Sequence, residues 1–335
     1  MASSLNKVED EAFVTLVTND VYGYGALVLG QSLRDAGTTR QLAIMVTPQV
    51  TQAMRRQLTF IYDVIQQVDP LDSQDAAHLA LLTRPELGIT FTKLHCWRLT
   101  QFKKCVFLDA DCLVLQNVDD LFEREELSAA PDVGWPDCFN SGVFVFCPSE
   151  ETYQGLLQCA VGQGSFDGGD QGLLNTYFNT WATADIRRHL PFVYNMTSAV
   201  SYSYRPALEK FGKDIKIVHF IGTSKPWRYS YYPETGTLSA PEGGSYHAEK
   251  YLKAWWEIFY KRVRPRIEEE QGIDLSGKFG KLHLEVSPSG TPGEGSPTED
   301  PQLQQWEKGQ MDYLGKDSYQ NIEKHMDTVL NGKSK

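Results

Sequence analysis

The chain has 335 residues, of which 41% are hydrophobic, and its formal net charge of −11 comes from 32 Lys and Arg against 43 Asp and Glu. This length allows one large domain or two ordinary ones with a sizeable core. The acidic balance argues against a broad nucleic-acid-binding surface. The first dozen residues lack the apolar core of a signal peptide, and no apolar run approaches the roughly 20 residues of a membrane-spanning helix.

The six cysteines contain no CxxC pair, which is typical of reduced, buried thiols. We therefore expect a soluble, cytoplasmic protein that binds neither nucleic acid nor membrane. The sequon Asn195-Met196-Thr197 is expected to be unused, because the chain shows no secretory signal.

Strands and helices alternate in the first third of the chain. A continuous β-rich apolar run predicts a strand at 13–18, and further strands are expected at 41–47, 63–69 and 104–110. Apolar spacing of the helical period predicts helices at 25–37, from Thr51 onward, and at 92–102. This alternation is typical of an α/β fold with a mostly parallel, Rossmann-like sheet between helices. Ligands bind such sheets at the carboxyl ends of the strands, where Asn19, Asp109 and Asp111 fall.

The second half of the chain is less regular. Strands are expected at 141–147 and 215–220, and helices from Ser149 onward and at 247–263, with a Gly-rich turn at 165–172. We expect one folded domain over residues 1–275. Residues 276–301 predict a flexible linker, since Pro, Ser and Gly fill eight of the ten positions 288–297. Residues 302–335 predict an amphipathic helix with Tyr319, Ile322 and Met326 on one face.

Two aspartates follow the strand in the stretch VFLDADC, residues 106–112. On a strand, Asp109 and Asp111 would point the same way, and two close carboxylates repel unless a proton or a cation intervenes. Carboxylate oxygens suit Mn²⁺ or Mg²⁺. The alternative is that one aspartate caps a turn and the other is solvated, so the pair alone does not establish a metal site.

Two further groups carry candidate chemistry. His219 ends the strand expected at 215–220, and as a third ligand it would complete a site with the two aspartates of the same sheet, a set that suits Mn²⁺ slightly better than Mg²⁺. Lys225 could meet phosphate charge, or be a solvated loop lysine. In the Gly-rich turn, Asp167 and Asp170 could stabilise positive charge at a reacting carbon, although Asp170 could also cap the following helix.

Seven motifs in chain order resemble the glycogenins, a family of self-glucosylating primers of glycogen synthesis. They are FVTLVTND (13–20), LTRPELG (82–88), TKLHCW (92–97), VFLDAD (106–111), FNSGVFVF (139–146), GSFDGGDQGLLN (164–175) and HFIGTSKPW (219–227). The resemblance spans about residues 12–265, and the end of the chain also resembles the segment with which that family recruits glycogen synthase. It implies the type-A nucleotide-sugar glycosyltransferase fold, with a catalytic domain over residues 1–275.

The resemblance also implies roles for individual residues. Asp109, Asp111 and His219 would hold Mn²⁺, with Mg²⁺ as the alternative. Asp170, Asp167 and Lys225 would serve catalysis. The wider site for UDP-glucose would add Leu16, Thr18, Asn19, Tyr22, Arg84, Lys93, Ala110, Asn140, Ser141, Gln171 and Gly222. The implied activity is retaining transfer of glucose from UDP-glucose, and the implied partners are glycogen synthase, through residues 302–335, an oligoglucan chain and a second copy of the chain in a homodimer.

The residues by themselves do not identify the acceptor tyrosine. The stretch 194–206 offers Tyr194, Tyr202 and Tyr204, and nothing in their spacing selects one. The family's Tyr-Ser-Tyr pattern places the glucosylated tyrosine at Tyr202. Two rival interpretations remain: a related transferase with another acceptor, and a non-catalytic scaffold that presents the C-terminal helix to a partner.

Overall fold

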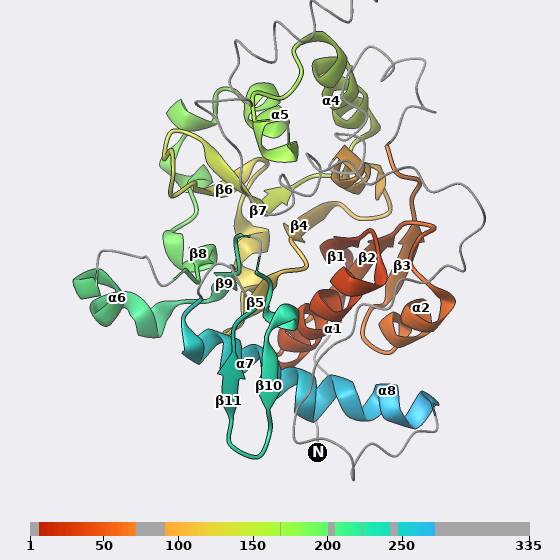
Figure 1. Cartoon of the computed structure of the whole chain (residues 1–335). Coiled ribbons are helices and arrows are strands. Elements are labelled where there is room, and N and C mark those ends of the chain that lie inside the picture. Colours follow the sequence, from red (N-terminus) through yellow and green to blue (C-terminus); the bar gives the residue numbers. More distant parts are fainter. Residues whose placement is uncertain are drawn as a thin grey trace, which may run out of the picture.

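A computed structural model describes residues 7–71, 91–167, 169–199, 205–222, 224–241 and 247–271 (Figure 1). The expected linker and C-terminal helix lie outside the described residues, as do Arg84, Tyr202 and Tyr204. No helix in the described ranges is long and apolar enough to cross a membrane.

A six-stranded sheet forms the centre of the molecule, with strand order β3-β2-β1-β4-β7-β6. Its strands are β1 (Val8–Val17), β2 (Arg40–Val46), β3 (Val64–Gln67), β4 (Lys104–Leu108), β6 (Ser128–Pro131) and β7 (Phe139–Phe146). The first four strands run parallel to one another, whereas β7 is antiparallel to both β4 and β6. The parallel part of the sheet agrees with the prediction, and the antiparallel edge is an addition that the sequence did not reveal.

Both faces of this sheet are buried, which explains why its strands are continuously apolar in sequence. Neighbouring residues of one strand enter different hydrophobic clusters. Phe13 packs on one face with the helices α1 (Asp20–Asp35) and α7 (Glu249–Ile258), and Val14 packs on the other with η1 (Thr92–Arg98) and α4 (Glu150–Gly162). The middle of the sheet is inaccessible to solvent, with all of β7 and nearly all of β4 buried, whereas β3 at the edge is half-buried or exposed. The sheet is thus a rigid platform whose polar positions lie at its ends.

The helices follow the sequence signals closely. They are α1 (Asp20–Asp35), α2 (Gln52–Thr59), α4 (Glu150–Gly162), α5 (Asp170–Tyr177), α6 (Arg205–Phe211), α7 (Glu249–Ile258) and α8 (Arg264–Gln271). Thr51 and Ser149 are N-caps whose side chains accept hydrogen bonds from backbone N–H groups of the first turn. The segment expected as a helix at 92–102 is instead a short 3₁₀ helix, η1 (Thr92–Arg98).

A second sheet of three short strands lies beside the first, in the order β5 (Cys112–Val114), β9 (Ile217–His219), β8 (Met196–Thr197). Strand β5 runs antiparallel to β9 and pairs Cys112 with His219. The expectation that His219 and the two aspartates share one sheet is therefore wrong. The aspartates lie in the turn that leaves the central sheet at β4 and enters the second sheet at β5. The remaining hairpin, β10 (Ser230–Tyr232) with β11 (Thr237–Ser239), packs on α7, where the Tyr231 ring stacks on Trp256 (Figure 1).

Candidate active site

The turn between β4 and β5 positions the two aspartates. The Asp109 N–H donates to the Gly142 carbonyl of β7 at 2.9 Å, and the Cys112 N–H donates back to the Asp109 carbonyl at 2.9 Å. On the other side, α1 packs so closely that a Cβ on Gly25 would lie 2.5 Å from the Ala110 oxygen. The aspartates thus belong to a tight, supported turn and not to a strand as the sequence suggested.

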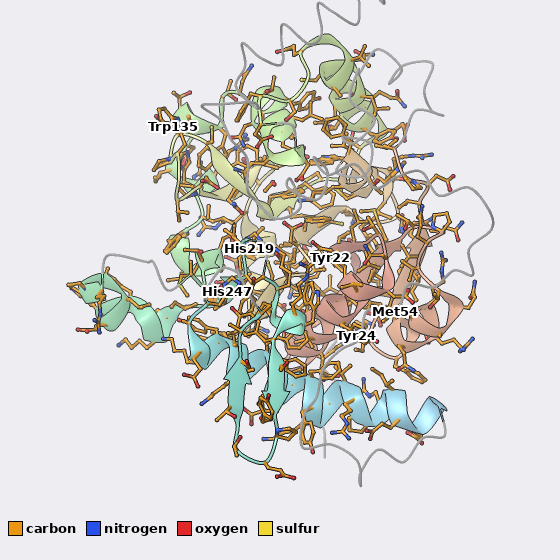
Figure 2. All side chains as sticks on the ribbon, viewed as in Figure 1. Tyr22, Tyr24, Met54, Trp135, His219 and His247 are labelled. Atoms are coloured by element: carbon orange, nitrogen blue, oxygen red, sulfur yellow. The ribbon has the colours of Figure 1, made fainter. Side chains whose placement is uncertain are left out.

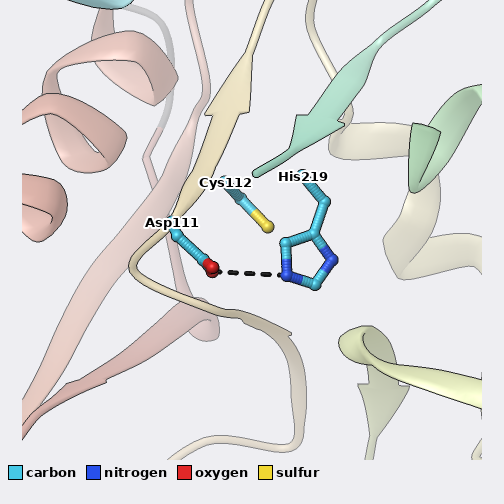
Figure 3. A group of neighbouring side chains, drawn as sticks. All are labelled: Asp111, Cys112 and His219. Carbon is cyan, nitrogen blue, oxygen red and sulfur yellow. Dashed lines mark ion pairs between the residues drawn. The ribbon is translucent and has the colours of Figure 1, made fainter. Parts of the chain in front are cut away.

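His219 meets both aspartates from the second sheet. Its Nε2 lies 3.3 Å from Asp111 Oδ1 and 3.8 Å from Asp109 Oδ2. Asp111, Cys112 and His219 present atoms that all lie within 4.8 Å of one another, near enough to bind one ion (Figure 3). Burial raises the pKa of the Cys112 thiol, and the thiolate is the form that ligates metals. Carboxylates and imidazole are therefore the better donors here.

Two lysines neutralise the aspartates. Lys93, on η1, lies 3.0 Å from Asp109 Oδ1 and 2.6 Å from Asp170 Oδ2. Lys225, in the loop after β9, contacts Asp111 Oδ2 and donates to the Phe220 carbonyl at 3.0 Å. Both ammonium groups are largely buried, so Lys225 is not the solvated loop lysine that the sequence left open.

The two aspartates of the turn have opposite electrostatic situations. Burial raises the pKa of Asp109, and the neighbouring Asp111 raises it further, against the opposing effect of Lys93. Burial acts on Asp111 in the same direction, but Lys225 and His219 outweigh it and lower its pKa. An additional cation at this turn would relieve the like-charge conflict, which is what a divalent metal does at such a pair.

The two aspartates of the Gly-rich loop make different contacts. Asp170, the first residue of α5, accepts a hydrogen bond from Ser141 Oγ at 2.8 Å in addition to its contact with Lys93. Asp167 is exposed, and its Oδ1 accepts from the backbone N–H groups of Gly169 at 2.8 Å and Gly172 at 3.0 Å. Asp167 therefore caps the start of α5, leaving Asp170 free to face the buried cluster.

A network of amide side chains links α5 to the second sheet. Gln171 accepts a hydrogen bond from the Ser141 N–H and donates to Asp132 Oδ2, the same atom to which Asn140 donates. The Asn140 oxygen in turn accepts from Asn195 Nδ2 at 2.8 Å. Sequence reasoning did not single out Asp132, and it noticed Asn195 only as part of a sequon.

The carboxyl end of β1 lies next to this cluster. Leu16 and Thr18 are half-buried, and Asn19 is the N-cap of α1. The Tyr22 ring packs edge-on against Trp227 with 5.4 Å between ring centroids, and burial raises the pKa of its hydroxyl. In the view of Figure 2, Tyr22 and His219 both lie near the middle of the molecule. Lys225 and Asp111 both act electrostatically on that hydroxyl, so this end of the first strand and the aspartate turn form one site.

Of the remaining expected site residues, Gly222 occurs in the loop after β9 with a φ of 115°, a conformation that favours glycine. Tyr194, one of the three candidate acceptors, is buried, and its hydroxyl donates to Asp120 Oδ2 at 2.6 Å. Arg84, Tyr202 and Tyr204 lie outside the described residues.

The site as a whole alternates carboxylates with cations at the end of a parallel sheet, beside an aromatic ring at the first strand. Such an arrangement can receive a nucleotide at β1, a diphosphate with a divalent cation at the aspartate turn, and a sugar toward α5. It is the arrangement of a nucleotide-sugar transferase.

Comparisons with known proteins agree with this class. The chain matches the family model of glycosyl transferase family 8 over residues 13–126 and 122–230. Among solved structures, its fold is similar to the WbbM bifunctional glycosyltransferase (TM-score 0.56, 15% identity, 80% of this chain and 52% of that one). It is also similar to the glycosyltransferase GlyE of Streptococcus pneumoniae (TM-score 0.52, 19% identity, 83% of this chain and 66% of that one). At these identities the likeness shows the fold alone.

Curated relatives narrow the assignment. The chain is 54% identical to glycogenin-1 of Oryctolagus cuniculus over 96% of this chain and 99% of that one. It is 50% identical to human glycogenin-1 over the same shares, and 53% identical to human glycogenin-2 over 82% of this chain and 55% of that one. The chain belongs to glycosyl transferase family 8 and, within it, to the glycogenins. The type-A fold and the glycogenin-type glucosyltransferase activity expected from the sequence are thereby confirmed.

Proposed function

We propose that the chain transfers glucose from UDP-glucose to its own Tyr202 with retention of configuration, and then extends the product into an α-1,4-linked oligoglucan. The observation that carries this proposal is the charge alternation at the site: Asp111 and His219 meet beside Lys225, and Asp109 is joined to Asp170 through Lys93. Diphosphate and sugar would lie at the two ends of this row. In the transfer, the bond from the glucose C1 to the diphosphate breaks and a bond to the phenolic oxygen forms, with release of the phenolic proton.

The residues at the turn fit a divalent cation. Asp109, Asp111 and His219 offer two carboxylates and an imidazole, a donor set that suits Mn²⁺, with Mg²⁺ as the alternative. When bound, such an ion supplies Lewis-acid stabilisation of the departing diphosphate. Lys225 adds positive charge at the same place, and the backbone beside Gly222 would approach the phosphates closely.

The sugar end of the site is built from α5 and β7. Asp170 points toward Lys93 and Ser141, so its carboxylate would stabilise positive charge that develops at the reacting carbon. Asn140, Ser141 and Gln171 would bind sugar hydroxyl groups. Asp167 would contribute by holding the loop that presents Asp170. At the other end, Leu16, Thr18, Asn19 and Tyr22 would hold the uridine, together with Arg84.

One of the three candidate acceptor tyrosines in the stretch 194–206 is disfavoured by its contacts. Tyr194 is buried and its hydroxyl is engaged by Asp120, so it is a poor acceptor. This leaves Tyr202 and Tyr204 of the candidate stretch, and the family pattern favours Tyr202.

The proposal extends to partners and location. Glycogen synthase would bind residues 302–335, and two copies of the chain would form a homodimer, both on the strength of the family resemblance. A cytoplasmic location is supported by the six cysteines, none of which forms a disulfide.

Intact-mass spectrometry tests the function directly. The purified chain, incubated with UDP-glucose and Mn²⁺ and no other protein, should gain mass in steps of one hexose, and EDTA should prevent the gain. A chain that hydrolyses UDP-glucose without gaining mass would be a transferase with a different acceptor. A chain that does neither would be the non-catalytic scaffold.

A further inference from the structure

Asn195 lies behind His219 and has no role in the site described so far. It connects η5 (Phe192–Tyr194) to β8 and is 5% exposed. Its Oδ1 lies 3.0 Å from His219 Nδ1, and its Nδ2 lies 2.8 Å from Asn140 Oδ1. Both ends of this buried amide are therefore engaged, one of them with the imidazole that faces the two aspartates.

The direction of these hydrogen bonds follows from the two groups at the far end of the network. Asn140 Oδ1 accepts at 3.0 Å from the Gly142 backbone N–H, which can only donate, and Asn140 Nδ2 donates at 2.9 Å to the Asp132 carboxylate. The oxygen of Asn140 must therefore face Asn195, and Asn195 must turn its NH₂ group toward it. This leaves the amide oxygen of Asn195 facing His219.

An amide oxygen can only accept, so the Nδ1 of His219 must carry a proton. In the neutral imidazole the lone pair is then on Nε2, the atom that lies 3.3 Å from Asp111 Oδ1. The ring has little freedom to turn, because a Cβ on Gly142 would lie 2.1 Å from its Cε1 atom. The tautomer is thus set by the amide of Asn195, which has no described contact with either aspartate, and Gly142 limits the rotation of the ring.

We propose that Asn195 is a positioning residue of the divalent-cation site: its amide oxygen holds His219 in the Nδ1–H tautomer and presents Nε2 as a ligand beside Asp111. This inference rests on the metal-ligand role of His219 proposed above. Partners that orient a ligating histidine in this way commonly contribute 10–100-fold to metal affinity.

The first test needs no variant. ¹⁵N NMR of the histidine-labelled chain at alkaline pH, without metal and again with Mg²⁺ and UDP, reports which imidazole nitrogen carries the proton, and His219→Ala identifies the signal. We expect a protonated Nδ1 and an unprotonated Nε2 for His219. A protonated Nε2 would overturn the inference.

The second test measures Mn²⁺ affinity by titration with detection of free Mn²⁺ by electron paramagnetic resonance. Asn195→Leu removes the acceptor at similar volume and should weaken Mn²⁺ binding by about 10–100-fold. Gln31→Leu is the matched control, because Gln31 is an equally buried amide that donates to Asp35 on α1, away from the aspartate turn.

The outcomes separate this inference from the proposed function. If His219→Ala leaves Mn²⁺ affinity unchanged, the metal-site assignment itself fails. If His219→Ala weakens binding but Asn195→Leu does not, then Asn195 has no positioning role. The NMR result on the wild-type chain decides the question even where Asn195→Leu does not fold.

Discussion

The ammonium group of Lys93 lies 2.6 Å from the Oδ2 atom of Asp170, although the two residues come from η1 and α5, on either side of β7 in the sequence. The same nitrogen lies 3.0 Å from Asp109. Burial opposes the charge of Lys93, but the two carboxylates outweigh it and raise its pKa. One buried cation therefore connects the aspartate turn to the aspartate proposed to act on the sugar.

Lys93→Met tests this connection. Methionine keeps most of the volume but leaves two carboxylates without their cation, so glucose transfer should fall by about 100-fold or more. The free energy of unfolding should fall by about 3 kcal/mol, as when one partner of a buried ion pair is removed. Lys103→Met is the control, because Lys103 pairs with Asp10 at the surface, with 82% of its side chain exposed. Denaturant unfolding and single-turnover transfer assays check both, and equal behaviour of the two variants would contradict the prediction.

Asp111→Asn should abolish both glucose transfer and hydrolysis of UDP-glucose. Asp111 contacts Lys225 and approaches His219, so loss of its charge weakens the site for the cation and for the diphosphate together. Calorimetry should show weaker UDP binding at ordinary Mn²⁺ concentrations. Full activity under those conditions would show that Asp111 is not a metal ligand.

Asp170→Asn should behave differently. Asp170 contacts Lys93 and Ser141, and no described contact joins it to His219 or Lys225. Calorimetric UDP binding with Mn²⁺ should therefore persist, while transfer drops by about 100-fold or more. If UDP binding is lost as completely as in Asp111→Asn, then Asp170 supports the metal site and has no direct part in transfer.

Tyr202→Phe removes only the phenolic oxygen of the proposed acceptor. Its mass should show no attached glucose after incubation with UDP-glucose and Mn²⁺, while glucose transfer to an added maltoside should continue because the donor site is intact. Tyr194→Phe is the control: it loses the hydrogen bond to Asp120, worth about 1 kcal/mol, yet should still become glucosylated. Peptide mapping that places the hexoses on Tyr194 or Tyr204 would move the acceptor without changing the activity.

Deletion of residues 302–335 should leave self-glucosylation intact and abolish capture of glycogen synthase in a pull-down. The apolar stripe of Tyr319, Ile322 and Met326 is the surface expected to enter a partner's groove. Thermal unfolding of the truncated chain provides the check: a large fall in the midpoint would mean that this segment packs on its own domain.

Local sequence signals determined the central platform. Local apolar stretches predicted β1, β2, β3 and β4. The helices predicted from Thr51 and from Ser149 do begin there, with these two residues as their N-caps. These signals are reliable because burial on both faces and capping of free N–H groups act on residues close together in the chain. Recognition of the aspartate pair, His219 and the Gly-rich loop likewise needed only short motifs.

Tertiary structure decided how those motifs meet. Strands β5 and β8 are three and two residues long, too short for a periodic pattern to predict. The sequence did predict a strand at β9, but only its pairing with β5 brings His219 to Asp111. The pairing of β5 with β9 joins segments more than a hundred residues apart, and only the folded chain offers the partner backbone.

The division of work between Asp167 and Asp170 has a similar origin. Both lie in one loop, and the sequence left open whether Asp170 caps the following helix or faces the sugar. The structure assigns the cap to Asp167, because Lys93 and Ser141 draw Asp170 inward. Asn195 shows the same dependence most clearly. An asparagine in the sequence does not indicate a particular chemical role. Its hydrogen bond with His219 follows from the fold, because a buried polar group needs a hydrogen-bond partner.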